Sequence, residues 1–338
     1  MADTVVLTGV TGFLGGHLAL ELLASGYHVR GSLRNPARAD AVRAALTAAG
    51  ADVTRLSFVT LDLTRDAGWA EAMAGARFLI HAASPFVTTM PKDKAELIGP
   101  AVAGTERALA AALAAGVERI VLTSSSVAIV NGRGAGGPAF LGAADWADPE
   151  SGRLNAYAES KVRAERRAWD MLRGQEQRLV VVNPGFITGP LLDEDPGTSG
   201  ALVQRFLRGQ IPLAPDLTLH GVDVRDLARL HVAALTDPAA AGQRIPAAFG
   251  HADIRELGQI IGRAHPAYSR RMPRFRAPHW LMRLYALVDG DIRANLVELG
   301  YRPHLQADMA ARLLQRAPVT MARSVADMAG SLIARGLA

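Results

Sequence analysis

Residues 4–26, TVVLTGVTGFLGGHLALELLASG, decide the fold of this 338-residue chain. The β-branched run at 4–8 predicts a buried strand, and the apolar periodicity of 13–26 predicts a helix that stops at Gly26. Three glycines stand where the strand passes into the helix: Gly9, Gly12 and Gly15. Glycines there allow a tight turn and a close approach of the backbone to a pyrophosphate, while the first N–H groups of the helix face the phosphates. The stretch therefore predicts a strand–turn–helix unit that binds a dinucleotide.

The alternation of strand and helix continues beyond this stretch. β-Branched runs predict further strands at 27–34, 55–63, 76–84, 119–126 and 178–185. Helical patterns cover 95–115 and 157–173, and Asn35 followed by Pro36 predicts the start of another helix. Strands and helices that alternate at this pace form right-handed βαβ units, which build a parallel sheet with helices on both faces.

This alternation breaks after Pro190. Segments rich in glycine and proline occupy 190–216, whereas HGVDVRDLARLHVAAL (220–235) predicts a return to the sheet and then a helix. We therefore expect an α/β fold, in which a Rossmann-type, doubly wound parallel sheet carries a smaller C-terminal substrate-binding cap. The sheet domain would comprise 1–189 and 217–248, and the cap 190–216 and 249–338.

Composition excludes several kinds of function. The net charge is +5, but the arginines are scattered among acids without a basic run, which argues against nucleic-acid binding. The chain has no cysteine, so disulfides and thiol catalysis are excluded, and its histidines lack ligand spacing, so we expect no metal. We find no secretory leader and no apolar run of about 20 residues, which predicts a cytoplasmic chain that binds no membrane.

The end of the second predicted strand indicates which dinucleotide binds. NAD-binding folds usually carry an acid there, which bonds to the ribose 2′-hydroxyl. This chain instead has Arg34, in GSLRNPAR (31–38), and the first acid beyond it is Asp40. A guanidinium pairs well with a 2′-phosphate. We therefore expect NADP(H) rather than NAD(H).

Tyr157 and Lys161 stand four residues apart in NAYAESKVRAERRAW (155–169), so they share one face of the predicted helix. Lysine is rare in this chain, which otherwise uses arginine, and the only others are Lys92 and Lys94. A phenol is a poor proton donor or acceptor at neutral pH, and a nearby ammonium stabilises its phenolate form. A guanidinium is not an equivalent replacement. The pair therefore predicts an acid–base tyrosine that is activated by a lysine.

Three serines stand at the carboxyl end of a predicted strand, in LTSSS (122–126). Ligands of open α/β sheets sit at the carboxyl ends of the strands. A hydroxyl at this place can hold a substrate carbonyl oxygen and stabilise the developing alkoxide. Spacing alone leaves three candidates for this role: Ser124, Ser125 and Ser126.

Together, these motifs resemble the extended short-chain dehydrogenase/reductases, which include dihydroflavonol reductases, cinnamoyl-CoA reductases and related aldehyde and ketone reductases. The resemblance covers nearly the whole chain. Besides the tyrosine–lysine stretch, six segments follow in the family's order: VTGFLGGHLALELLASGYHVRGSLRNP (10–36), DLTRDAGW (62–69), HAASPF (81–86), VERIVLTSSS (117–126), NPGFITGP (183–190) and VDVRDLARLH (222–231).

The resemblance implies a role for each matching residue. It makes Ser125 the catalytic serine, Tyr157 the acid–base group, and Lys161 the group that activates Tyr157 and binds the ribose. The cofactor contacts that it implies are Gly9, Gly12, Phe13, Leu14, Gly15, Arg34, Asp62, Leu63, Ala82, Ala83, Thr123, Tyr157, Lys161, Pro184, Gly185, Phe186 and Ile187. The substrate contacts that it implies are Ser84, Phe86, Ser125, Asn131, Tyr157, Phe186 and Leu191.

Two departures from the family's pattern bear on specificity. A second basic residue that some members use for the 2′-phosphate is replaced here by Ala41, so that Arg38 or Arg43 would have to substitute for it. The glycine-rich segment NGRGAGGPAFLGAADW (131–146) differs from the plant enzymes. The preference of flavonoid reductases therefore does not carry over to this chain.

The sequence thus predicts an NADPH-dependent reductase of aldehydes or ketones, with hydride from nicotinamide C4 and a proton from Tyr157. Its substrate would be a small molecule with an apolar or aromatic part. The same fold also serves oxidative hydroxysteroid-type dehydrogenases, NAD-dependent nucleotide-sugar epimerases and non-catalytic NADP-sensing regulators. Arg34 argues against an epimerase, and the joint presence of Tyr157 and Lys161 argues against a regulator. A homodimer formed through the helices that begin near Ala95 and Tyr157 is a further expectation.

Overall fold

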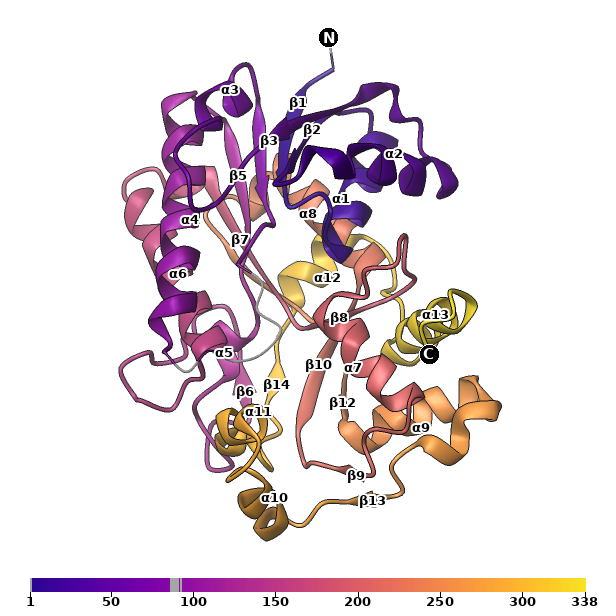
Figure 1. The fold of residues 1–338 in the computed structure, drawn as a ribbon. Coiled ribbons are helices and arrows are strands. Elements are labelled where there is room, and N and C mark those ends of the chain that lie inside the picture. Colours follow the sequence, from indigo (N-terminus) through magenta and orange to yellow (C-terminus); the bar gives the residue numbers. More distant parts are fainter. Residues whose placement is uncertain (1, 86–90, 92) are drawn as a thin grey trace.

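The computed structural model describes residues 2–85, 91 and 93–338, and its centre is a seven-stranded parallel sheet (Figure 1). In sheet order the strands are β11 (Arg244–Ala247), β7 (Leu179–Pro184), β5 (Arg119–Thr123), β4 (Phe78–His81), β1 (Thr4–Thr8), β2 (His28–Leu33) and β3 (Leu56–Thr60). All of their pairings are parallel. The sequence order reverses between β1 and β4, and such a switch point is where open α/β sheets bind ligands.

Helices cover both faces of this sheet, as the alternation predicted. One face carries α1 (Phe13–Ala24), α2 (Ala39–Ala48), α8 (Val224–Thr236) and α12 (Asp308–Leu314). The other carries α3 (Trp69–Met73), α4 (Ala95–Ala114) and α6 (Ala156–Met171). In β1, Val5 and Leu7 enter the first core and Val6 enters the second. Because side chains alternate along a strand, a strand buried on both faces is apolar throughout.

The cap has its own sheet and its own core. Its sheet runs in the order β12 (His251–Asp253), β10 (Thr218–Asp223) and β8 (Phe186–Thr188). The helices α7 (Gly197–Leu207), α9 (Ile254–Ala264) and α13 (Met321–Ala334) pack around a core that includes Phe206, Leu257 and Met328. The shorter elements are α5 (Val127–Val130), β6 (Phe140–Leu141), β9 (Leu213–Ala214), β13 (Phe275–Arg276), α10 (His279–Tyr285), α11 (Gly290–Ala294) and β14 (His304–Leu305).

The prediction that 220–235 returns to the main sheet is correct for its helix and wrong for its strand. The strand part, β10, pairs with β8 and β12, and the strand that rejoins the large sheet is β11. The reason lies at Gly185, between β7 and β8, where a Cβ would stand 2.0 Å from the carbonyl oxygen of His220. The backbone of β10 therefore runs directly against this crossing point, whereas α8 returns to the large sheet beside α1.

One helix of the C-terminal segment, which was predicted to belong to the cap, packs on the large sheet instead. Helix α12 packs against α8 and β11, and its Ala310 and Leu313 belong to the core of the large sheet. The two-part division of the chain into a sheet domain and a cap stays a prediction. It puts α12 in the cap, and it puts β8 and β10, which belong to the small sheet, in the sheet domain.

By length and composition alone, α4 is the one helix in the described part of the chain that would be long and apolar enough to cross a membrane. Its position is that of a helix that covers a sheet. It packs along α6, its Leu109 and Ala112 are buried in the core, and its Glu106 forms an ion pair with Arg167 of α6.

Candidate active site

The loop between β1 and α1 depends on glycine at two places. Gly9 has a φ of +77°, and a Cβ there would stand 3.0 Å from the backbone nitrogen and Cα of Ala83. A Cβ on Gly15 would lie 1.9 Å from the carbonyl oxygen of Gly9. Gly12 precedes α1 with extended backbone and no side-chain cap, so the first N–H groups of the helix, from Phe13 onward, are open to an anion. The loop therefore has the shape that a pyrophosphate needs.

Arginines follow the second strand, as the sequence indicated. Arg34 is exposed directly after β2, and Arg38 is exposed with its Nη2 3.7 Å from Oδ2 of Asp193. Arg43 is committed elsewhere, because its guanidinium donates to the carbonyl of Leu56 at 2.9 Å. Of the two arginines that remained open for a 2′-phosphate beside Arg34, Arg38 is thus the available one.

The third strand contributes a turn. The carboxylate of Asp62 accepts hydrogen bonds from the backbone N–H and the hydroxyl of Thr64, each at 2.8 Å, and these bonds lower the pKa of Asp62. Leu63 follows and packs against Gly104 of α4. A Cβ added to Gly104 would stand 3.0 Å from the Cβ of Leu63. Asp62 therefore stays ionised at the edge of the sheet.

The remaining predicted cofactor residues lie along the same edge. Ala82, Ala83 and Ser84 follow β4, Thr123 ends β5, and the segment 184–187 spans the end of β7, Gly185 and the start of β8. Because β7, β5, β4 and β1 are neighbours in a parallel sheet, their carboxyl ends meet, and the structure brings these residues together with the glycine loop.

A buried histidine joins β1 to β4 beneath the loop. Nδ1 of His81 lies 2.9 Å from Oγ1 of Thr8, and that hydroxyl also accepts from the N–H of Ala83 at 3.1 Å. Burial lowers the pKa of His81 to about 3, and the charge of Lys161 acts in the same direction. His81 is therefore neutral at physiological pH and fixes the strand ends.

The three predicted catalytic residues come from two elements. Ser125 is buried between β5 and α5. Tyr157 and Lys161 lie in the first turns of α6, and Nζ of Lys161 is 5.9 Å from the centre of the Tyr157 ring. The helix begins there because Asn155 caps it, with its side chain accepting from the N–H of Ala158 at 2.8 Å.

A small cavity of about 20 Å³ lies between the two elements. Its lining includes Lys161 from α6, Thr123 and Ser124 from the end of β5, and His81 and Ser84 from the end of β4. The cavity is large enough for one water molecule. The lysine thus lies beside the strand ends that carry the serines and the cofactor residues.

Sequence reasoning missed a buried acid on the catalytic helix. Glu165 is fully buried, accepts from the hydroxyl of Ser124 at 2.6 Å, and forms an ion pair with Arg244 at 2.5 Å. A signal for it existed, because Tyr157, Lys161 and Glu165 are spaced at four-residue intervals and so share one helix face.

The predicted substrate residues are more dispersed. Asn131 directly follows α5 and is half-buried, and Phe186 packs against the core of the cap. Leu191 is buried within that core. Phe86 lies outside the described residues. The substrate-binding roles of all four stay predictions.

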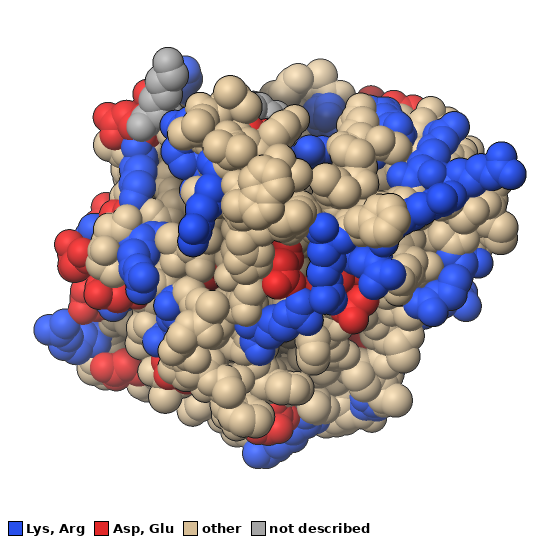
Figure 2. All heavy atoms as spheres, turned by 90° about the horizontal axis from the view of Figure 1, so that it is seen from below, with Lys and Arg blue, Asp and Glu red and all other residues tan. Residues whose placement is uncertain are grey.

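The cap holds an apolar pocket of about 540 Å³ between α7, the segment 210–219, α10 and α11. Leucine, isoleucine, proline and methionine line most of it, among them Leu217, Leu281 and Met282. One of its polar wall residues, Asn295, accepts a hydrogen bond from Nδ2 of Asn155 at 3.3 Å. A residue of the pocket wall is therefore hydrogen-bonded to the residue that caps the catalytic helix. The face seen from below in Figure 2 carries many lysine and arginine side chains, with acidic side chains between some of them.

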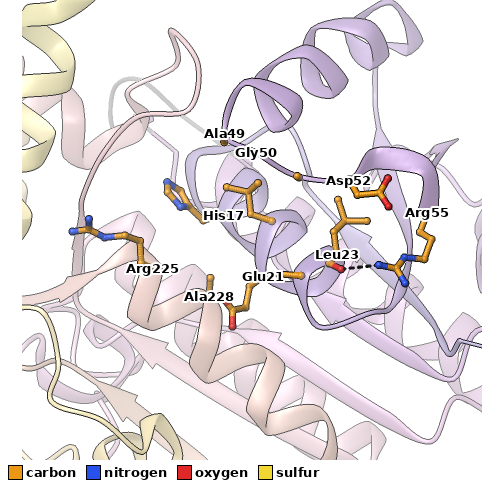
Figure 3. Close-up of a pocket in the computed structure, with 12 residues that line it drawn as sticks. His17, Glu21, Leu23, Ala49, Gly50, Asp52, Arg55, Arg225 and Ala228 are labelled. Atoms are coloured by element: carbon orange, nitrogen blue, oxygen red, sulfur yellow. Dashed lines mark hydrogen bonds between the residues drawn. The ribbon is translucent and has the colours of Figure 1, made fainter.

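A second hollow lies away from these residues. It is a groove of about 410 Å³ between α1, α8 and the segment 49–52. Figure 3 shows His17, Glu21 and Arg225 among the residues of its wall. It lies on the helical layer rather than at the carboxyl ends of the strands, and none of the predicted site residues lines it. We therefore do not count it as part of the site.

Comparisons with known proteins agree with this geometry. The model of the NAD dependent epimerase/dehydratase family matches residues 5–247. Tetraketide alpha-pyrone reductase 2 of Arabidopsis thaliana is 32% identical over 78% of this chain and 83% of that protein. A putative dihydroflavonol 4-reductase of Synechocystis is 32% identical over 91% of this chain and 84% of that protein. Among solved structures, Gre2 of Candida albicans in complex with NADPH is 26% identical, with a TM-score of 0.77 over 98% of this chain and 99% of that chain.

Proposed function

The chain belongs to the NAD dependent epimerase/dehydratase family, and from this membership and the geometry of the site we propose that it is an NADPH-dependent reductase of aldehydes and ketones. The resemblance to extended short-chain dehydrogenase/reductases is thereby confirmed. One observation carries the proposal: Lys161, one turn from Tyr157 on α6, lines a cavity together with Thr123 and Ser124 at the end of β5.

The residues present fit an NADPH molecule. The glycine loop and the start of α1 offer backbone N–H groups to the pyrophosphate, and exposed Arg34 and Arg38 offer guanidinium groups to a 2′-phosphate. The residue that would bind a 2′-hydroxyl in an NAD enzyme is absent after β2, where Arg34 stands. When bound, the reduced nicotinamide supplies the hydride.

The chain's own side chains handle the oxygen and the proton. Ser125 and Tyr157 donate hydrogen bonds to the carbonyl oxygen, which stabilises the negative charge that develops on it. Tyr157 then gives its proton to this oxygen, so that the product is the alcohol. Lys161 stabilises the tyrosinate that remains, because an ammonium lies close to the phenol ring.

The relatives reported above are reductases, which favours this reaction over the oxidative dehydrogenase and the epimerase. The apolar pocket indicates the class of substrate. A pocket of this size with few polar groups suits a largely apolar ligand, and we propose that it receives the tail of a medium-sized aldehyde or ketone. A homodimer formed through α4 and α6, a cytoplasmic location, and the absence of nucleic-acid and membrane partners stay predictions.

The test is NADPH oxidation by purified protein, with NADH alongside, on a panel of aromatic and aliphatic aldehydes and ketones. We expect turnover that prefers NADPH and that is lost in Tyr157→Phe. Tyr268→Phe is a matched control, because this tyrosine lies in the cap, where it packs against the cap core. Full turnover by Tyr157→Phe would refute the mechanism, and no turnover by the wild type on any carbonyl would refute the function.

A further inference from the structure

The two hydroxyl groups that hold the substrate oxygen come from separate elements. Ser125 follows β5, whereas Tyr157 lies on α6. Both must reach the same oxygen atom at once, and such geometry has to be held within about 0.5 Å for efficient reaction. The contacts between β5 and α6 therefore matter for the chemistry.

We propose that Glu165 and Arg244 are positioning residues, which form a buried clamp that sets the distance between Ser125 and Tyr157. This inference rests on the proposed reductase function and adds two residues to it. Neither residue belongs to the predicted site.

Glu165 is the centre of the clamp. It lies about two turns beyond Tyr157 on α6 and is fully buried. Its Oε2 accepts from the hydroxyl of Ser124 at 2.6 Å and from Nδ2 of Asn183 at 2.8 Å, and its Oε1 accepts from Nε of Arg244 at 2.5 Å. One carboxylate on the catalytic helix thus holds β5, β7 and β11.

The backbone of the catalytic serine is fixed by the same group of contacts. The N–H of Ser124 donates to the carbonyl of Val182, and the N–H of Ser126 donates to that of Pro184, each at 2.8 Å. Between them, Nδ2 of Asn183 donates to the carbonyl oxygen of Ser125 at 3.3 Å. These bonds fix the backbone on both sides of Ser125 and its own carbonyl oxygen. The hydroxyl of Ser125 accepts from the N–H of Val127 at 3.4 Å, which leaves its hydrogen for the substrate.

Arg244 extends the clamp to the segment that follows α5. Its side chain is buried, and its Nη1 donates to the carbonyl oxygens of Ala143 and Asp145, both at 2.6 Å. Its guanidinium carbon lies 3.7 Å from the centre of the Trp146 ring. Among the described residues, its ion-pair partner is Glu165. The pair therefore joins the catalytic helix to the segment that follows α5.

A role in stability alone does not account for this arrangement. A buried ion pair loses the hydration of both charges, and apolar residues of similar volume often serve folding equally well. Here Glu165 lies on the same helix as Tyr157, and it accepts hydrogen bonds from Ser124, the neighbour of Ser125, and from Asn183 on β7. The arrangement fits a device that fixes geometry.

The test compares two variants with a control in single-turnover hydride transfer from NADPH to the best carbonyl substrate of the panel. Ser124→Ala removes the hydroxyl contact to Glu165 alone. The double variant Glu165→Leu/Arg244→Met removes both charges together and keeps most of the volume, so no charge stays buried without a partner. Arg167→Gln is the control, since this residue forms an exposed ion pair on the same helix.

Each rate is divided by the number of NADPH sites found by titration, so unfolded molecules do not contribute. We expect hydride transfer in the double variant to slow by about tenfold or more at saturating substrate, since small displacements of reacting groups cost rate steeply. Ser124→Ala should slow it by a smaller factor, Arg167→Gln should not change it, and NADPH affinity should stay within about twofold throughout.

A double variant that transfers hydride at the wild-type rate per site would overturn the clamp alone. Equal losses of NADPH affinity and rate would also overturn it, because the pair would then support the fold in general. A wild type that reacts with no carbonyl would overturn the proposed function together with the clamp.

Discussion

Gly12→Ala and Gly15→Ala should separate dinucleotide binding from folding, although the two glycines lie in one short loop. A Cβ on Gly15 would stand 1.9 Å from the carbonyl oxygen of Gly9, and ordinary contact begins at 3.4 Å, so the loop and α1 must part by 3.4 − 1.9 = 1.5 Å. Both sides of this contact are backbone, which cannot rotate away. Overpacking of this kind costs about 1–3 kcal/mol, and we expect the upper end of that range.

Gly12 differs, because the nearest atom to its Cβ would be the Gly9 carbonyl oxygen at 3.5 Å, and its φ of −85° suits any residue. Gly12→Ala should therefore lower the free energy of unfolding by less than about 1 kcal/mol. Its methyl group would nonetheless stand where the backbone approaches the pyrophosphate, so NADPH affinity should fall by about tenfold or more.

Urea unfolding without cofactor and NADPH titration by fluorescence measure the two effects on the same samples. Gly15→Ala should unfold at clearly lower urea than the wild type, whereas Gly12→Ala should unfold near the wild type and bind NADPH poorly. The reasoning would be refuted if Gly15→Ala were as stable as the wild type, or if Gly12→Ala bound NADPH with unchanged affinity.

Three other expectations can be tested on the same protein. Burial lowers the pKa of His81 to about 3 and that of His231 to about 4. As the pH falls below the unfolded pKa of 6.5, only the unfolded chain binds a proton at these histidines. Each histidine should therefore lower the free energy of unfolding by about 1.4 kcal/mol per pH unit until its folded pKa is reached. A urea midpoint that is the same at pH 7.5 and pH 5, or one that depends on pH as strongly in His231→Gln as in the wild type, would contradict this. Arg34→Ser should reduce kcat/KM for NADPH roughly tenfold and leave that for NADH nearly unchanged, and an unaltered ratio would exclude Arg34 from the 2′-phosphate site. In a series of straight-chain aldehydes, kcat/KM of the wild type should rise by roughly fourfold for each added methylene. Met282→Trp, in the apolar pocket, should stop this rise at a shorter chain, whereas Leu284→Trp, at an exposed position, should not. If the two variants and the wild type showed the same dependence on chain length, the apolar pocket would be excluded as the site of the tail.

Much of the large sheet was predictable because its signals are local. The apolar run of β1, the three glycines and the cap at Asn35 each act within a few residues, and the structure confirms the strand, the turn and the helix start that they predicted. Tyr157 and Lys161 were found in the same way, since four-residue spacing alone puts them on one helix face.

Long-range contacts account for what the sequence left out. The side chain of Glu165 meets Ser124, Asn183 and Arg244, which lie 41, 18 and 79 residues away, and no spacing rule connects such positions. The pairing of β10 with β8 depends on the close approach at Gly185, which only the folded backbone reveals. The sequence offered Arg38 and Arg43 equally as ligands of a 2′-phosphate. Only the structure shows that the guanidinium of Arg43 already donates to the carbonyl of Leu56.

The return of α12 to the large sheet limits how this enzyme can be re-engineered. A chimera that grafts the whole segment after β11 from a relative would also exchange Ala310 and Leu313, which lie in the core of the large sheet beside α8. The donor's helix would then have to fit a recipient surface that it did not evolve with. A transplant of new specificity should therefore end before Asp308 and leave α12 native, with α13 exchanged separately if the donor's cap requires it.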